Sequence, residues 1–136
     1  MMKDSALARL AATTKTLGHP ARLRILAMLR QNRLSVCQIA SVLGVAPSTA
    51  SNYLIELRRA DLVTEQRQGK WVYYRLTDEP PIDALLRFVL VLIGADEQVQ
   101  QDALSARRLG GSSPDLVCTA LAENRPLAVS EQPPRE

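Results

Sequence analysis

The sequence predicts a mainly α-helical fold with one small β-hairpin, in the element order of a winged helix-turn-helix. Aromatic residues make up only 4% of the 136-residue chain, so the core must be aliphatic, which suits helix packing. Two short helical patterns joined by a tight turn lie within residues 34–60. Two β-rich runs around a short glycine-containing connection follow within residues 62–76. The length fits one domain, residues 1–107, followed by a flexible tail, residues 108–136.

The N-terminal part predicts two helices separated by a break. Leucines recur at helical spacing over residues 5–17, and Gly18-His19-Pro20 interrupts the pattern. Pro20 suits the first position of the next helix, where the missing N–H leaves no bond unmade. His19 is the only histidine in the chain, and within this break we expect it to be structural rather than a metal ligand.

The next two helices form the predicted helix-turn-helix. Ser35 and Gln38 have the spacing of a capping box, and Gly44 is expected to end this helix in the left-handed conformation. Pro47 opens the second helix, from about residue 48 to residue 60. Ala50, Tyr53, Leu54 and Leu57 fall on one side of a helical wheel, and small polar groups fall on the other side together with Ile55. The polar side and its edges hold Ser48, Thr49, Ser51 and Asn52, a composition that lets the backbone approach a phosphate or a base edge closely.

The predicted hairpin pairs residues 62–67 with residues 71–76 and carries basic side chains, including Arg67 and Lys70 near its tip. Such a tip can contact phosphates beside a DNA-reading helix. Its aromatic residues are expected to pack the hairpin onto the helices. One long helix is then predicted over residues 81–107. Because this helix is apolar on nearly all sides around residues 88–93, we expect it to form a dimer interface.

Charge is divided unevenly along the chain. Residues 1–75 hold 12 Lys and Arg against 4 Asp and Glu, a net charge of +8, whereas residues 76–136 have a net charge of −5. A basic half joined to the helix-turn-helix pattern favours duplex DNA as the partner. The sequence contains no apolar run long enough for a transmembrane helix, no Gly-rich phosphate loop and no catalytic constellation. We therefore expect a cytoplasmic protein that contacts no membrane and is not an enzyme.

Several blocks, in the same order, resemble the ArsR/SmtB family of dimeric bacterial winged-helix repressors, which metal or metalloid ions release from DNA. The blocks are LGHPARLRIL at residues 17–26, SVCQI at 35–39, PSTAS at 47–51 and GKWVYYRL at 69–76. The similarity spans about residues 5–95. It implies that the helix opened by Pro47 is the recognition helix, with Ser48, Ser51, Asn52 and Tyr53 near the major groove of operator DNA. No cofactor for DNA binding is implied.

The resemblance also implies an inducer site, but this chain departs from the family pattern. Arsenic-responsive members often carry a Cys-Val-Cys block with another cysteine three residues on. Here Ser35, Cys37 and Ala40 occupy those three cysteine positions, so one thiol remains. Zinc-responsive members place His, Asp and Glu ligands on the dimer helix, and residues 81–107 contain no histidine. The second thiol of the chain is Cys118.

Three interpretations of the cysteines remain open. Cys37 can be a small buried core residue. Following the resemblance, we expect Cys37 and Cys118 together to bind trivalent arsenic or antimony, including an organoarsenical that needs only two thiolates, and this binding to release the repressor from its operator. The same thiols can form a disulfide in a redox or persulfide switch. A winged-helix protein-interaction module without an inducer is a further alternative, because fold does not fix function.

Overall fold

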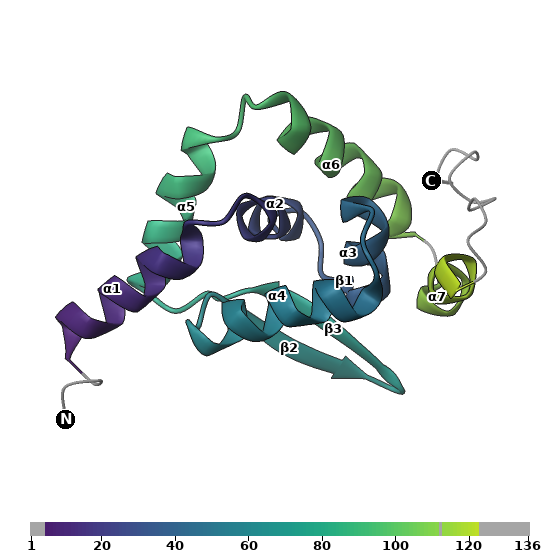
Figure 1. Ribbon diagram of the computed structural model, residues 1–136, viewed down its shortest axis with the longest axis horizontal. Coiled ribbons are helices and arrows are strands. Elements are labelled where there is room, and N and C mark those ends of the chain that lie inside the picture. Colours follow the sequence, from purple (N-terminus) through teal and green to yellow (C-terminus); the bar gives the residue numbers. More distant parts are fainter. Residues whose placement is uncertain (1–4, 112, 123–136) are drawn as a thin grey trace.

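The computed structural model describes residues 5–111 and 113–122, and Figure 1 shows the arrangement of its elements. In chain order these are α1 (Ala6–Leu17), α2 (Pro20–Leu29), β1 (Leu34–Ser35), α3 (Val36–Leu43), α4 (Pro47–Arg59), β2 (Val63–Gln68), β3 (Trp71–Leu76), α5 (Ile82–Leu92), α6 (Glu97–Leu109) and α7 (Pro114–Ala122). The α3–turn–α4 pair followed by the β2–β3 hairpin confirms the predicted mainly helical winged helix-turn-helix. None of the described helices is long and apolar enough to cross a membrane.

The capping residues in the sequence correctly predicted the first helix of the helix-turn-helix, α3. The Ser35 hydroxyl accepts a hydrogen bond from the backbone N–H of Gln38, and the Gln38 side chain accepts one from the backbone N–H of Ser35, which completes the capping box. Gly44 ends α3 with φ 74°, in the left-handed region that favours glycine. Pro47 then starts α4 at its first position.

A third strand accompanies the hairpin, and the sequence patterns did not predict it. The sheet has the order β1-β3-β2 and is antiparallel throughout, with Leu34 opposite Tyr74 and Val63 opposite Leu76. β1 is only two residues long, too short to show a strand periodicity. It nevertheless joins the beginning of α3 to the hairpin, so these two parts of the motif share a sheet.

The core lies between α2, α3, α4 and the inner face of the sheet. Its large buried hydrophobic side chains include no aromatic ring, as the low aromatic content predicted; they include Ile25, Leu26, Met28, Leu34, Ile39, Leu54, Leu57 and Leu62. On α4 the buried residues are Ala50, Leu54 and Leu57, which confirms the apolar side of the predicted wheel. The opposite side of α4 therefore remains available to a partner.

The single long helix predicted over residues 81–107 is wrong. The structure divides this segment into α5 and α6, with a break over residues 93–96. The Asp96 side chain accepts a hydrogen bond from the backbone N–H of Val99 and so starts a new helix. The apolar run ends at this break, so α5 is apolar, whereas α6 is polar apart from the side that packs on α2 and α3.

Buried polar contacts hold α6 in place. Arg24 of α2 forms a bidentate ion pair with Asp102, whose carboxylate is almost fully buried. The Gln38 side-chain amide donates a hydrogen bond of 2.9 Å to the carbonyl oxygen of Leu109 at the end of α6. α7 follows and packs against α3, with Val117 fully buried. The short helix around Cys118 is thus part of the folded structure.

Candidate DNA-binding surface and thiol pair

The beginning of α4 presents small polar side chains to solvent. Ser48 and Asn52 are exposed, and Thr49, Ser51 and Tyr53 are half-buried. The carboxylate on α4 lies farther along, where Glu56 pairs with Arg59 at 3.2 Å. The first two turns therefore combine closely approachable backbone with no negative side chain, which suits contact with DNA phosphates and base edges.

His19 supports this helix. Its Nδ1 accepts a hydrogen bond of 3.1 Å from the backbone N–H of Ala21 and so caps α2, as expected for a structural histidine. The His19 ring also contacts the Tyr53 ring, with 5.1 Å between centroids and a tilt of 55°. This contact restricts the orientation of Tyr53 on α4. His19 thus packs against α4, a function that sequence spacing alone did not reveal.

The hairpin carries two basic residues, Arg67 and Lys70, near its tip. Gly69 adopts φ 62° in the turn between β2 and β3. Lys70 follows it, with its ammonium 5.0 Å from the centre of the Trp71 ring, and Arg67 is exposed on β2. In Figure 1 the turn lies at the same end of the molecule as α3, after which α4 begins. The fold therefore brings the polar start of α4 and the basic tip to one side of the molecule.

The two cysteines lie together in one chain. Cys37 is the second residue of α3, Cys118 lies on α7, and a disulfide joins them with 5.3 Å between their Cα atoms. Both are half-buried. Packing of Val117 and Ala120 positions α7 against α3, which brings Cys118 beside Cys37. The sequence identified both thiols but left open whether they meet within or between chains.

The surroundings of the pair limit its chemistry. Ser35 and Ala40 occupy the positions where a multi-cysteine site would have further thiols. Within residues 5–111 and 113–122, no three His, Cys, Asp or Glu side chains group in a way that could hold a metal ion. The site thus offers two sulfur atoms at disulfide distance. This arrangement suits a dithiol–disulfide couple, or a ligand that takes two thiolates.

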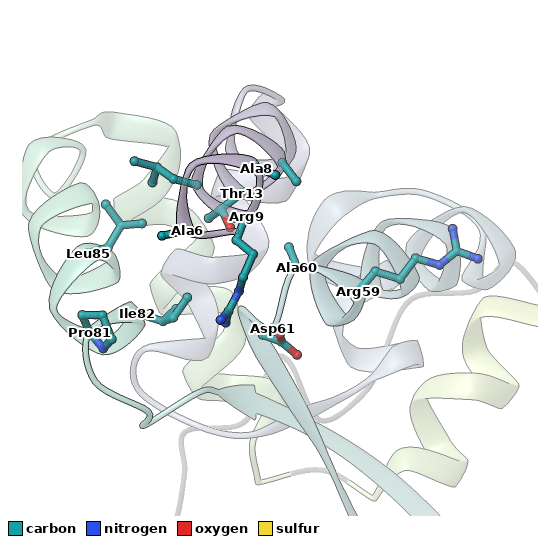
Figure 2. A pocket seen from close by; sticks show the side chains of 12 residues that line it. Ala6, Ala8, Arg9, Thr13, Arg59, Ala60, Asp61, Pro81, Ile82 and Leu85 are labelled. Atoms are coloured by element: carbon teal, nitrogen blue, oxygen red, sulfur yellow. The ribbon is translucent and has the colours of Figure 1, made fainter. Parts of the chain in front are cut away.

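An exposed apolar surface lies on α1 and α5, away from the sheet. A hollow of about 830 Å³ runs between α1 and α5, lined by residues such as Leu10, Ile82 and Leu85, and Figure 2 shows Arg9 extending from α1 into the space near Ile82. Large apolar side chains beside it are exposed, including Leu7 at 82% and Phe88 at 64%. Exposed large apolar side chains on neighbouring helices are typical of a surface that another protein chain covers.

Known proteins share both the sequence pattern and the architecture. The family model described as "Bacterial regulatory protein, arsR family" matches residues 19–65. The chain is 34% identical to the arsenic resistance transcriptional regulator ArsR1 of Pseudomonas putida over 71% of this chain and 76% of that protein. It is 35% identical to the HTH-type transcriptional regulator Rv0324 of Mycobacterium tuberculosis over 87% of this chain, and spans about half, 51%, of that longer protein.

A solved structure agrees with these matches. The homodimeric winged helix-turn-helix DNA-binding domain Mb0332 from Mycobacterium bovis superposes with a TM-score of 0.60 and 32% identity, covering 70% of this chain and 87% of that chain. The structural similarity thus covers more of the chain than residues 19–65, which the family model matches. This chain belongs to the ArsR family of bacterial DNA-binding transcriptional regulators.

Proposed function

We propose that this chain is a homodimeric repressor whose affinity for operator DNA depends on the chemical state of Cys37 and Cys118. The observation that carries the proposal is the pairing of the only two cysteines across α3 and α7. One of them lies on the first helix of the reading motif. A chemical change at the pair therefore acts directly on the DNA-binding unit.

For DNA binding, we assign α4 to the major groove. Ser48, Thr49, Ser51, Asn52 and Tyr53 would contact bases and nearby phosphates, and Arg67 and Lys70 would contact the backbone beside them. The exposure of the polar start of α4 and the basic character of residues 1–75 support this assignment. Two chains would join through the exposed apolar side chains of α1 and α5, as the homodimeric state of the Mycobacterium bovis domain supports. Two recognition helices would then read two half-sites.

Two connections lead from the thiol pair to the DNA-binding elements. α3 continues directly from β1, which pairs with β3 of the hairpin, so the wing and Cys37 are joined through two residues of strand. Gln38, next to Cys37, bonds to the last residue of α6. A bond between α7 and α3 therefore restrains α3 and, through it, the helix-turn-helix and the sheet. We propose that this lowers the population of the DNA-competent dimer.

The best-supported chemistry is reversible oxidation. In the reduced cytoplasm expected for this chain, both cysteines are thiols and the repressor binds DNA. Hydrogen peroxide oxidises one thiolate to a sulfenic acid and releases hydroxide. The second thiolate attacks the sulfenic sulfur, displaces a second hydroxide and forms the disulfide, and protons from the solvent convert both hydroxides to water. One peroxide is thus reduced as two thiols are oxidised. A polysulfide would act through a persulfide in place of the sulfenic acid.

A trivalent arsenical is the second candidate, because the similar ArsR1 protein is an arsenic resistance regulator. Trivalent arsenic and antimony prefer sulfur ligands. An arsenical with one carbon substituent needs two thiolates, the number that Cys37 and Cys118 provide. Inorganic arsenite prefers three, so it would need a thiol from outside the chain. We therefore expect an organoarsenical to act more strongly than arsenite.

Operator release tests these alternatives. The operator is first selected from a random duplex pool with the reduced protein, and binding is then followed by fluorescence anisotropy. We expect hydrogen peroxide, polysulfide or phenylarsine oxide to weaken binding at least tenfold in wild type, and to leave Cys37→Ser and Cys118→Ser bound. Mass spectrometry after thiol alkylation identifies which adduct forms.

The outcomes separate the parts of the proposal. Release of both serine variants by the same reagents would refute sensing by the pair. Release by phenylarsine oxide alone would favour the arsenical and reject the redox switch. Failure of the reduced wild type to select any DNA would refute the repressor function itself.

A further inference from the structure

The exposed side of α4 carries one large apolar side chain, Ile55. Ser48, Asn52 and Ile55 follow one another at intervals of four and three residues, so they share one side of the helix. All three are exposed, Ile55 at 44%, whereas Ala50 and Leu54 are buried on the opposite side. We call Ser48, Asn52 and Ile55 the exposed row of α4. Two of its members can form hydrogen bonds, and the third offers only apolar contact.

Packing within the chain does not explain Ile55. Within residues 20–76, all of which the structure describes, it is the one large hydrophobic side chain that is exposed. It belongs neither to the core nor to the partly buried hydrophobic residues packed against the core, and it does not line the hollow between α1 and α5. A β-branched residue also favours a helix less than alanine or leucine does. The folded monomer therefore gains little from isoleucine here, which favours contact with a partner.

The charges near Ile55 do not exclude a polyanion. The adjacent Glu56 pairs with Arg59 at 3.2 Å, and Arg58 pairs with Glu65 at 2.8 Å. Glu56 and Glu65 are the acidic residues of α4 and β2, so each carboxylate of these two elements has an arginine partner. DNA can therefore approach the third turn of α4 without meeting an unpaired carboxylate of either element.

The major groove offers one apolar group for such a side chain, the C5 methyl of thymine, and asparagine suits the N6 and N7 atoms of adenine. Asn52 and Ile55 are separated by about 4.5 Å along the helix axis, close to the spacing of about 3.4 Å between base pairs. We propose that Ile55 is a specificity-determining residue that contacts a thymine methyl in each operator half-site, on the base pair that Asn52 contacts or on a neighbouring one. The inference rests on the proposed DNA binding by α4 and deepens it, because it names a base that the helix selects.

Removing the methyl group from the DNA tests this contact without altering the protein. The operator is selected from a random duplex pool with reduced full-length protein, and binding is measured by fluorescence anisotropy. Each thymine of the operator is then replaced in turn by deoxyuridine, which lacks only the C5 methyl. We expect one thymine in each half-site whose replacement weakens wild-type binding about fourfold, the effect of one methyl group losing an apolar contact.

The variant Ile55→Ala identifies the side chain that makes the contact. Alanine favours a helix more than isoleucine does and the position is exposed, so we expect this variant to fold. It should bind the thymine and deoxyuridine duplexes with equal affinity. The matched control is Leu104→Ala, which shortens a similarly exposed side chain on α6 and should keep the fourfold preference. A second selection with Ile55→Ala should lose thymine at this position and keep the other selected bases.

The possible outcomes separate this inference from the proposed function. A selected operator in which no thymine responds to loss of its methyl would overturn the inference. A response that Ile55→Ala retains in full would also overturn it, because another side chain would then contact the methyl. A wild-type protein that selects no operator would instead refute the repressor function, and the inference would fall with it.

Discussion

The buried ion pair between α2 and α6 gives the sharpest stability prediction, through Asp102→Asn. Asp102 is 2% exposed and accepts three hydrogen bonds: 2.8 and 3.0 Å from the Arg24 guanidinium, and 2.9 Å from the Gln98 amide. The substitution keeps the volume of the side chain but removes its charge. Arg24 then remains beside a neutral amide that cannot accept both of its bonds.

The magnitude follows from burial. Removing one partner of a buried ion pair costs about 3–5 kcal/mol. The Arg24 side chain is 26% exposed, so water compensates part of the loss, and we expect about 2–3 kcal/mol. For a chain of this size that corresponds to a fall in melting temperature of about 10 °C. The hydrogen bond to Asp102 raises the pKa of Arg24 despite partial burial, so loss of the arginine proton does not weaken the pair at any pH below the ordinary arginine range.

Urea denaturation followed by circular dichroism measures the effect, on reduced protein at a fixed chain concentration. The matched control is Asp83→Asn, which removes the carboxylate of an exposed pair with Arg87 and should cost at most about 0.5 kcal/mol. A loss in Asp102→Asn no larger than the control would refute the reasoning. Replacing both partners, as Arg24→Met with Asp102→Leu, should recover most of the stability because no charge is left unpaired.

Three further predictions concern local structure. Gly44→Ala places a side chain at φ 74°, where no other atom lies within 4 Å of the new Cβ, so the expected loss of about 1 kcal/mol in unfolding free energy is purely conformational. The control is Gly18→Ala, which should cost less because Gly18 has a negative φ. Equal losses for the two variants in chemical denaturation would contradict this. Ser35→Ala removes a buried capping oxygen and should lower the unfolding free energy by about 1 kcal/mol in the same assay. An unchanged unfolding free energy would argue against the capping box. Burial, and then a nearby carboxylate, raise the pKa of Tyr74. Its folded form thus keeps a proton that the unfolded chain loses above about pH 10, so unfolding free energy falls as pH rises past that point. Tyr74→Phe should weaken this fall, and an unchanged alkaline profile would contradict the assignment.

Much of the helix-turn-helix was predictable because interactions between residues close in the sequence determine it. The Ser35 capping box, the left-handed Gly44 and the first-turn Pro47 each act within one or two turns of helix, and all three appear in the structure. The paired strands of the hairpin follow from local composition for the same reason. The family resemblance identified the winged-helix architecture, and the similar proteins confirm it.

Features that depend on contacts between distant residues were harder to predict from the sequence. The split between α5 and α6 depends on Asp96, whose capping role was hidden within a continuous run of helix formers. β1 exists because Leu34 fits the core opposite Tyr74, a contact across 40 positions of sequence. The Arg24–Asp102 pair and the Cys37–Cys118 pair likewise join distant segments, and single-chain spacing does not predict such contacts.

If the proposed dimer forms through the exposed apolar side chains of α1 and α5, the concentration of the chain controls both its stability and its DNA binding. Association that covers Leu7, Phe88 and Val91 stabilises the folded chain by mass action, so its melting temperature rises with concentration. Occupancy of a two-half-site operator then depends on the dimer fraction and rises faster than linearly with the amount of protein. Newly synthesised chains would leave the operator open until they reach the dimerisation threshold, which builds a delay into repression without any further component.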